Sequence, residues 1–222
     1  MPTRRAKMYQ RAREQLRMVI ASLGAAMREP ALIFLLSPAN LSGRRAAMLF
    51  DPAAQFPLAR ELRSAQGAAL GELFSFVSSL YFRGKLAYAG AFGHAPMGQQ
   101  PAYVISAGGG LCPPEQRFTL ERLQAWAKAT IAHDNPHFTA PLTRHASELL
   151  DRSEKGSRFV LLGSVASNKY VAPLLDVFGS ALFFPQQFAT LGDMSRGSLL
   201  LRAVRERSEL SYAPVAGARR TR

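Results

Sequence analysis

Short apolar runs, each ended by a polar turn, alternate along this chain with longer stretches of helical periodicity. Residues 31–36 and 159–162 are apolar at every position, which is typical of strands that are buried on both faces. Because strands that alternate with helices build an open sheet, the pattern predicts an α/β fold: one domain with a mainly parallel central sheet flanked by helices. Further strands are predicted at 103–107 and 181–184, and helices at 44–50, 58–63, 73–92 (one helix or two), 119–131, 143–150, 170–178 and 195–205.

The pattern divides the chain into three parts. Apolar residues recur at three- and four-residue spacing near the start, with arginines between them, so 1–30 is predicted to be a basic amphipathic helix. The α/β domain is expected to span 31–215, and 216–222 to form a basic tail. Within the domain, the dense aromatic residues of 73–92 indicate core packing, with Arg83 and Lys85 expected to point outward.

The charge balance points to a polyanionic partner. The chain has 28 Lys and Arg against 15 Asp and Glu, a formal net charge of +13. A field of this sign attracts nucleic acid, either DNA or RNA, and secondarily an anionic membrane surface. A protein partner is the alternative: the basic helix of a non-enzymatic interaction module would dock on an acidic surface in a larger bacterial assembly.

The single cysteine, Cys112, excludes an internal disulfide and a cysteine-based zinc cluster, which fits a reducing, cytoplasmic setting. No apolar run reaches the length of a membrane span. The arginine-rich start lacks a secretory pattern, although it also resembles an organellar transit peptide, which is kept as a minor alternative.

Polar loops follow the predicted strands, and the carboxyl ends of parallel strands are where open α/β sheets bind ligands. Hydroxyl, amide and ammonium groups in these loops are suited to an anion, and a glycine run after a strand lets backbone amides approach one. Asp193 is the candidate catalytic residue, because a carboxylate can act as a base or orient a water. The candidate substrate- or anion-binding residues are Ser37, Asn40, Ser106, Gly108, Gly109, Gly110, Ser164, Ser167, Asn168, Lys169, Tyr170, Ser195 and Arg196.

Each of these features also has a purely structural interpretation. The glycines 108–110 lack the spacing of a dinucleotide fingerprint or a P-loop and fit a flexible turn equally well. Asp193 is also a suitable cap for the helix 195–205. His133 and His137 have the spacing of a zinc pair, but Pro136 breaks a helix between them, so no metal and no cofactor is expected.

Three segments together resemble the YaaA-like group of bacterial proteins. They are the helix that reads SLYFRGKLAYA from Ser79, the strand and turn VISAGGGLCPPE from Val104, and the pattern LG…KY…L from Leu162, which is followed by Phe184-Pro185 and Leu191-Gly192. The likeness covers about 32–201 and implies an α/β fold related to that of uracil-DNA glycosylases, together with association with nucleic acid. Ser37, Ser106, Gly110, Gly163 and Tyr170 match the pattern of that group. Asn40 and Gly108 stand where that group has lysines, and Leu36 where it has a cysteine.

These observations lead to one functional expectation. The chain is predicted to be a nucleic-acid-associated protein that binds or processes a nucleobase or nucleotide at the carboxyl edge of its sheet. If it is an enzyme, the reaction expected first is hydrolysis of an N-glycosidic bond, with Asp193 orienting the water and the glycine-rich turn holding phosphate.

Overall fold

The central sheet is built around β1 (Leu32–Leu36), every residue of which is buried. In the computed structural model, which describes residues 30–166 and 168–218, this strand is parallel to both of its neighbours. In order across the sheet, the strands are β4 (Leu111–Cys112), β3 (Ala102–Ile105), β1, β6 (Arg158–Leu162), β7 (Leu182–Pro185) and β8 (Tyr212–Pro214). Only the edge strands β4 and β8 are antiparallel to their neighbours, so the predicted α/β domain with a mainly parallel sheet is confirmed.

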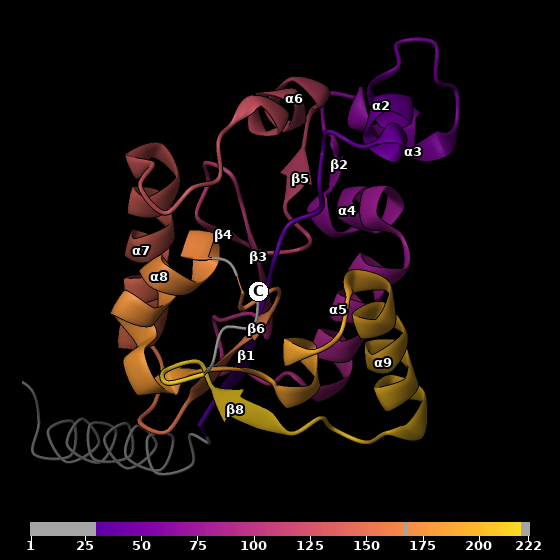
Figure 1. Ribbon diagram of the computed structural model, residues 1–222. Coiled ribbons are helices and arrows are strands. Elements are labelled where there is room, and N and C mark those ends of the chain that lie inside the picture. Colours follow the sequence, from indigo (N-terminus) through magenta and orange to yellow (C-terminus); the bar gives the residue numbers. More distant parts are fainter. Residues whose placement is uncertain (1–29, 167, 219–222) are drawn as a thin grey trace, which may run out of the picture.

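Helices cover both faces of this sheet (Figure 1). The pair α5 (Leu80–Phe92) and α9 (Asp193–Glu206) lies on one face, and the pair α7 (Pro136–Asp151) and α8 (Asn168–Phe178) on the other. Two 3-10 turns, 179–181 and 186–189, flank β7. Apolar residues of both helix pairs and of all four parallel strands form one continuous core.

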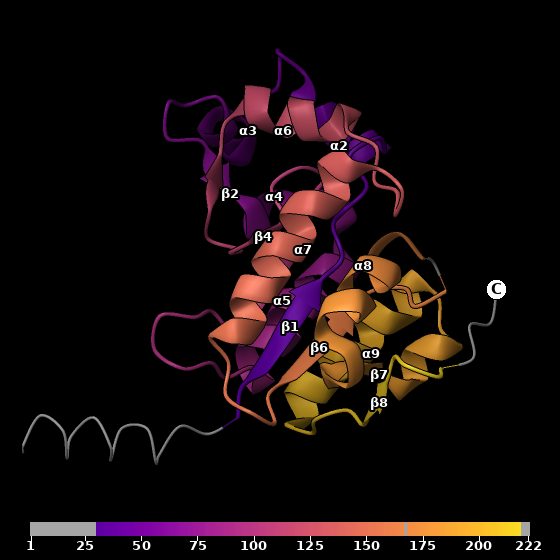
Figure 2. The same cartoon turned by 90° about the vertical axis from the view of Figure 1, so that its left-hand side faces the viewer.

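A third group of elements lies beyond the carboxyl end of β1 (Figure 2). There the antiparallel ribbon of β2 and β5 is surrounded by short helices, and the chain enters this group directly after β1. The group comprises α2 (Arg44–Phe50), α3 (Pro57–Leu62), β2 (Ala68–Ala69), α4 (Leu70–Ser78), β5 (Arg117–Phe118) and α6 (Leu120–Lys128). It therefore stands over the edge of the sheet where a ligand site was predicted.

Two helices differ from the sequence prediction. α7 begins at Pro136 rather than near residue 143, because a proline at the first helical position loses no hydrogen bond and Asn135 caps the helix through its side chain. The second proline, Pro141, is accommodated inside the same helix. α6 ends at Lys128, so Ile131 lies in the loop that follows it.

The predicted N-terminal helix lies outside the described residues, and so does most of the basic tail. Within residues 30–166 and 168–218, no helix is both long and apolar enough to cross a bilayer.

Candidate functional site

A cavity of about 650 Å³ lies between the carboxyl edge of the sheet and the group of short helices. Its walls come from the exits of β1, β3 and β6 and from α4, α5, α6, α8 and α9. The lining residues are Ser37, Pro38, Ala39, Asn40, Leu41, Ser42, Phe74, Ser78, Tyr81, Lys85, Ala107, Trp126, Ala127, Ala129, Ile131, Ser164, Lys169, Tyr170 and Asp193. The structure thus brings together six of the residues singled out in the sequence: Ser37, Asn40, Ser164, Lys169, Tyr170 and Asp193.

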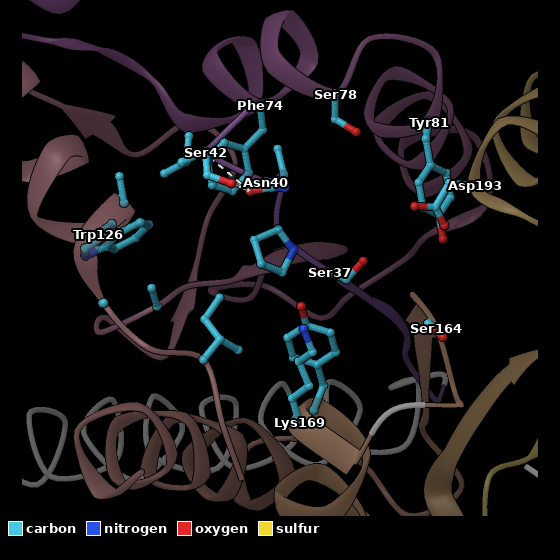
Figure 3. Close-up of a pocket in the computed structure, with 18 of the residues that line it drawn as sticks. Ser37, Asn40, Ser42, Phe74, Ser78, Tyr81, Trp126, Ser164, Lys169 and Asp193 are labelled. Carbon is cyan, nitrogen blue, oxygen red and sulfur yellow. Dashed lines mark hydrogen bonds between the residues drawn. The ribbon is translucent and has the colours of Figure 1, made fainter. Parts of the chain in front are cut away.

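The cavity has an aromatic side and an acidic side. In Figure 3, Trp126 stands on one side, and Tyr81 and Asp193 stand together on the other, with Ser37 between them. The Lys169 side chain extends from α8 toward the space between these two sides. A ligand in the cavity would therefore meet an indole ring at one end and a carboxylate at the other.

Ser37 is fixed where β1 and β6 end. Its backbone N–H donates to the Leu162 carbonyl oxygen at 3.2 Å, continuing the pairing of the two strands by one residue. Gly163, which follows Leu162, comes close to Ser37: a Cβ on Gly163 would lie 2.9 Å from Ser37 Cβ. Glycine at 163 therefore allows the two strand exits to meet.

Asn40 holds the loop that follows Ser37. Its Oδ1 accepts from Ser42 N at 3.0 Å and from Ser42 Oγ at 2.8 Å, which fixes the orientation of the amide. Because both bonds use the oxygen, the Nδ2 hydrogens are left to donate to a ligand.

Lys85 was expected to point outward, and that expectation is wrong. The side chain is buried, with 1 % of the residue exposed, and its Nζ donates to the Ser37 carbonyl oxygen and to Ser37 Oγ, both at 2.8 Å. Nζ also lies 4.0 Å from the centre of the Tyr81 ring, so it packs against an aromatic face. Burial lowers the pKa of Lys85 to about 7, an effect that the negative charge of Asp193 opposes and the positive charge of Arg196 reinforces.

Arg196 holds Asp193 in place at the acidic side of the cavity. It is buried, its Nη2 donates to the Phe188 carbonyl oxygen at 2.7 Å, and its Nη1 forms an ion pair with Asp193 Oδ1 at 3.2 Å. The Asp193 side chain itself is 71 % exposed. Arg196 therefore positions Asp193 at the cavity instead of reaching a ligand itself.

Tyr81 Oη and Arg196 Nε are both buried and make no hydrogen bond of normal geometry among the described residues. Burial raises the pKa of the Tyr81 hydroxyl well above its ordinary value, although the positive charge of the nearby Arg196 opposes the shift. The pKa of Tyr170 is also raised, because the hydroxyl is buried and because Asp193 is negative. Both hydroxyls are therefore protonated near neutral pH and can donate.

The glycine run is placed differently from the expectation. Gly108, Gly109 and Gly110 form the turn of the β3–β4 hairpin, where Ser106 Oγ accepts from Gly109 N at 2.7 Å and Ser106 N donates to the Gly110 carbonyl oxygen at 2.9 Å. None of these four residues lines the cavity; of this loop, only Ala107 does. Gly110 has φ +68° and lies against Pro141, so the run is explained by the geometry of the hairpin.

Ser195 and Asn168, two further predicted residues, do not line the cavity. Ser195 lines a separate surface hollow beside α9, with Met194 and Arg202. Asn168 begins α8 and does not line the cavity, and Ser167 lies outside the described residues. Asp193 is the first residue of α9 and follows the N-cap, Gly192, so its carboxylate lies at the positive end of the helix dipole without being the cap itself.

Several lining residues were not found from the sequence, chiefly Lys85, Tyr81 and Trp126. A signal for Lys85 was present: Tyr81, Phe82 and Tyr88 precede and follow it at helical spacings of four and three residues, which places the amine on the aromatic, buried face of α5. Lys85 shares that face and is buried with it. Trp126 packs in the core, with its ring centroid 4.3 Å from that of Phe118, and also lines the cavity.

Among residues 30–166 and 168–218, no three His, Cys, Asp or Glu side chains are grouped so that they could hold a metal ion. Cys112 is buried in β4, and burial raises the pKa of its thiol, so it is not an activated nucleophile.

Neither a protein-family model, nor a curated protein, nor a solved structure matches this chain. The resemblance to the YaaA-like group therefore stays a prediction from the sequence.

Proposed function

We propose that this protein associates with nucleic acid and holds one nucleotide unit, base and sugar, in the cavity at the carboxyl edge of its sheet. One observation carries the proposal: a cavity of about 650 Å³ combines aromatic walls with hydrogen-bonding side chains at the edge where α/β sheets bind ligands. Its volume lies within the range of about 300–1,000 Å³ that small-molecule sites occupy.

The wall chemistry suits a nucleobase. Trp126 and Tyr170 line the cavity with their rings, and stacking on an aromatic ring is tolerant of base identity because every base has a π-face. Asn40 Nδ2 can donate to the edge of a base, as an amide does. Lys169 supplies a positive charge for a phosphate.

Basic residues also adjoin the lining residues in sequence. Arg44 and Arg45 follow the lining loop 37–42 after one residue, Gly43, and Lys128 stands between Ala127 and Ala129, which both line the cavity. All three basic side chains are exposed. Together with the net charge of +13, they favour a polyanion whose backbone passes over the cavity while one nucleotide enters it.

The reaction favoured by this set of groups is hydrolysis of the N-glycosidic bond. Asp193 Oδ1 is held by Arg196, so Oδ2 is left to accept a hydrogen bond from a water. That water attacks the sugar C1′, the C1′–N bond breaks with its electron pair on the base, and the proton of the water ends on the base nitrogen. Asp193→Asn should bind nucleic acid as the unaltered protein does and lose this hydrolysis.

The test is the affinity for labelled single-stranded DNA, duplex DNA and RNA, measured by fluorescence anisotropy across a salt series. Lys169→Ala should weaken binding and lower the slope of log K against log salt by about 0.7–1, as expected for the loss of one phosphate contact. Lys155→Ala is the matched control, because Lys155 is exposed in the turn that precedes β6, at the opposite edge of the sheet.

Equal effects of the two lysine substitutions would place the contact elsewhere on the protein. Absence of binding at low salt would contradict the proposal. The net positive charge would then be explained by the alternative, a non-enzymatic interaction module that docks on an acidic protein.

A further inference from the structure

Ser37 and Lys85 form a buried pair in the wall of the cavity. Lys85 Nζ lies 2.8 Å from Ser37 Oγ and 2.8 Å from the Ser37 carbonyl oxygen. Ser37 Oγ is also within 3.3 Å of the Leu162 carbonyl oxygen, to which it can donate. Both residues line the cavity, so a ligand can reach the pair.

These contacts accommodate both protonation states of the amine. When Lys85 is an ammonium, it donates to the carbonyl oxygen and to Ser37 Oγ, and the Ser37 hydroxyl donates to Leu162. When Lys85 is neutral, one N–H still donates to the carbonyl oxygen, and the nitrogen lone pair can accept the proton of the Ser37 hydroxyl. The Ser37 carbonyl oxygen thus holds the amine in place in both states, while the amine changes from hydrogen-bond donor to acceptor toward Ser37 Oγ.

The surroundings favour the neutral amine. No carboxylate forms an ion pair with Lys85 among the described residues, and with 1 % of the residue exposed an ammonium would be almost without hydration. Burial lowers the pKa of Lys85 to about 7, which is close to the value that suits a general base at neutral pH.

We propose that Ser37 is a nucleophile, that Lys85 is its general base, and that the cavity hydrolyses carboxylic esters. A serine activated by a lysine is a known variant of nucleophilic catalysis. The proposal uses the cavity described above but other reacting groups, and it does not require the ligand to be a nucleotide.

The reaction has two balanced halves. In the first half, Lys85 takes the hydroxyl proton as Ser37 Oγ bonds to the acyl carbon, and the π electron pair of the ester carbonyl moves onto its oxygen. That pair then re-forms the carbonyl as the C–O bond to the alcohol breaks. The alcohol leaves with the proton from Lys85. Water then attacks the acyl-serine, giving its proton to Lys85. The acid departs as Ser37 Oγ recovers that proton.

The substrate class follows from the charges around Ser37. A tetrahedral acyl intermediate carries one negative charge, and side-chain donors must stabilise it because Pro38, which follows Ser37, has no N–H. Asn40 Nδ2 and Lys169 are donors in the lining for this purpose. A phosphodiester would need several cations, whereas Asp193 contributes a negative charge to the same cavity.

The test is labelling of the full chain by a fluorophosphonate, which reacts with activated serine hydroxyls, followed by mass spectrometry of its peptides. We expect one label per chain, on Ser37, with a rate that rises as the pH passes through about 7. The groups around Lys85 are Tyr81, Asp193 and Arg196, with Lys169 and Tyr170 across the cavity; burial raises the pKa of both tyrosines, so they stay neutral over this range.

Ser37→Ala should abolish the labelling and the hydrolysis of p-nitrophenyl acetate, and Lys85→Met should slow both by roughly 10²-fold or more. Ser198→Ala, which removes an exposed hydroxyl of α9, should change neither. Failure to label Ser37, or labelling of Ser37 at a rate independent of pH, would overturn the proposal. Because no nucleic acid is present in this assay, its outcome is separate from that of the binding test.

Discussion

Gly84 and Gly197 face each other where α5 packs against α9, so closely that a Cβ on Gly84 would lie 2.9 Å from the Gly197 carbonyl oxygen. A Cβ on Gly197 would in turn lie 2.9 Å from Tyr81 Cα. Tyr81 and Lys85 come from α5, and Asp193 and Arg196 from α9. The glycine contact therefore sets the distance between the two helices that form the acidic side of the cavity.

Gly84→Ala should destabilise the protein by about 1–3 kcal/mol, because the added methyl group meets backbone that must move. Gly90→Ala on the same helix is the control: Gly90 is exposed, a Cβ there meets nothing within 4 Å, and alanine should stabilise the helix by about 0.5–1 kcal/mol. Urea unfolding of both variants checks the pair of predictions. Equal free energies of unfolding would mean that the helices are not held at this distance.

Lys85→Met should alter the pH dependence of stability. The pKa of Lys85 falls from 10.5 to about 7 on folding, so between these values the unfolded chain binds a proton that the native protein does not. The free energy of unfolding of the unaltered protein should therefore rise with pH relative to that of Lys85→Met, by on the order of 1 kcal/mol per pH unit. Below about pH 7 the difference between the two proteins should level off. Parallel stability curves from about pH 6 to about pH 9.5 would show that Lys85 keeps its proton in the native protein.

Arg196→Ala should destabilise the protein by about 1.5–3 kcal/mol or more, because it removes a charged donor and leaves the buried Phe188 carbonyl oxygen without its partner. Arg202→Ala removes the same charge from an exposed position of α9 and should stay within about 0.5 kcal/mol of the unaltered protein. Thermal unfolding of the two variants distinguishes a positioning arginine from a surface one. Arg196→Ala with an unchanged Tm would return this residue to the candidates for direct ligand contact.

Gly110→Ala should lower the stability by about 1–3 kcal/mol, because Gly110 has φ +68° and a Cβ would lie 2.4 Å from the Pro141 carbonyl oxygen. Gly108→Ala, where a Cβ meets nothing within 4 Å, should leave both stability and nucleic-acid affinity unchanged. Calorimetry and anisotropy measure these quantities. A loss of affinity in Gly108→Ala would restore the glycine run as an anion site.

The strands of the parallel sheet could be predicted from the sequence because strand segments buried on both faces are apolar at every position, as β1 and residues 159–162 of β6 show. Their mainly parallel direction followed from the helices between them, and so did the edge at which the polar loops meet. Their order across the sheet was not predicted and comes from the structure. The short edge strands β4 and β8 were missed, since a strand of two or three residues has no periodicity to detect and β8 ends in Pro214.

The candidate site was predicted only in part, for a physical reason. Ser37 and Ser164 lie one and two residues beyond the ends of β1 and β6, so the sheet brings them together, and Lys169 lies in the first turn of α8, the helix that follows β6. Tyr81, Lys85 and Trp126 enter the cavity from helices whose packing depends on contacts such as Gly84 with Gly197, which are distant in the sequence. The glycine run lies in a hairpin turn outside the cavity, and the sequence could not distinguish the two interpretations because a hairpin turn and an anion-binding loop need the same backbone freedom.

Trp126, the single tryptophan of the chain, lines the cavity, so its fluorescence tests the central claim most directly. A short single-stranded oligonucleotide should change the Trp126 emission saturably, at the concentrations at which anisotropy reports binding, and Lys169→Ala should shift both curves to higher concentration. Binding by anisotropy with no change in Trp126 emission would contradict the account, because the nucleic acid would then lie outside the cavity.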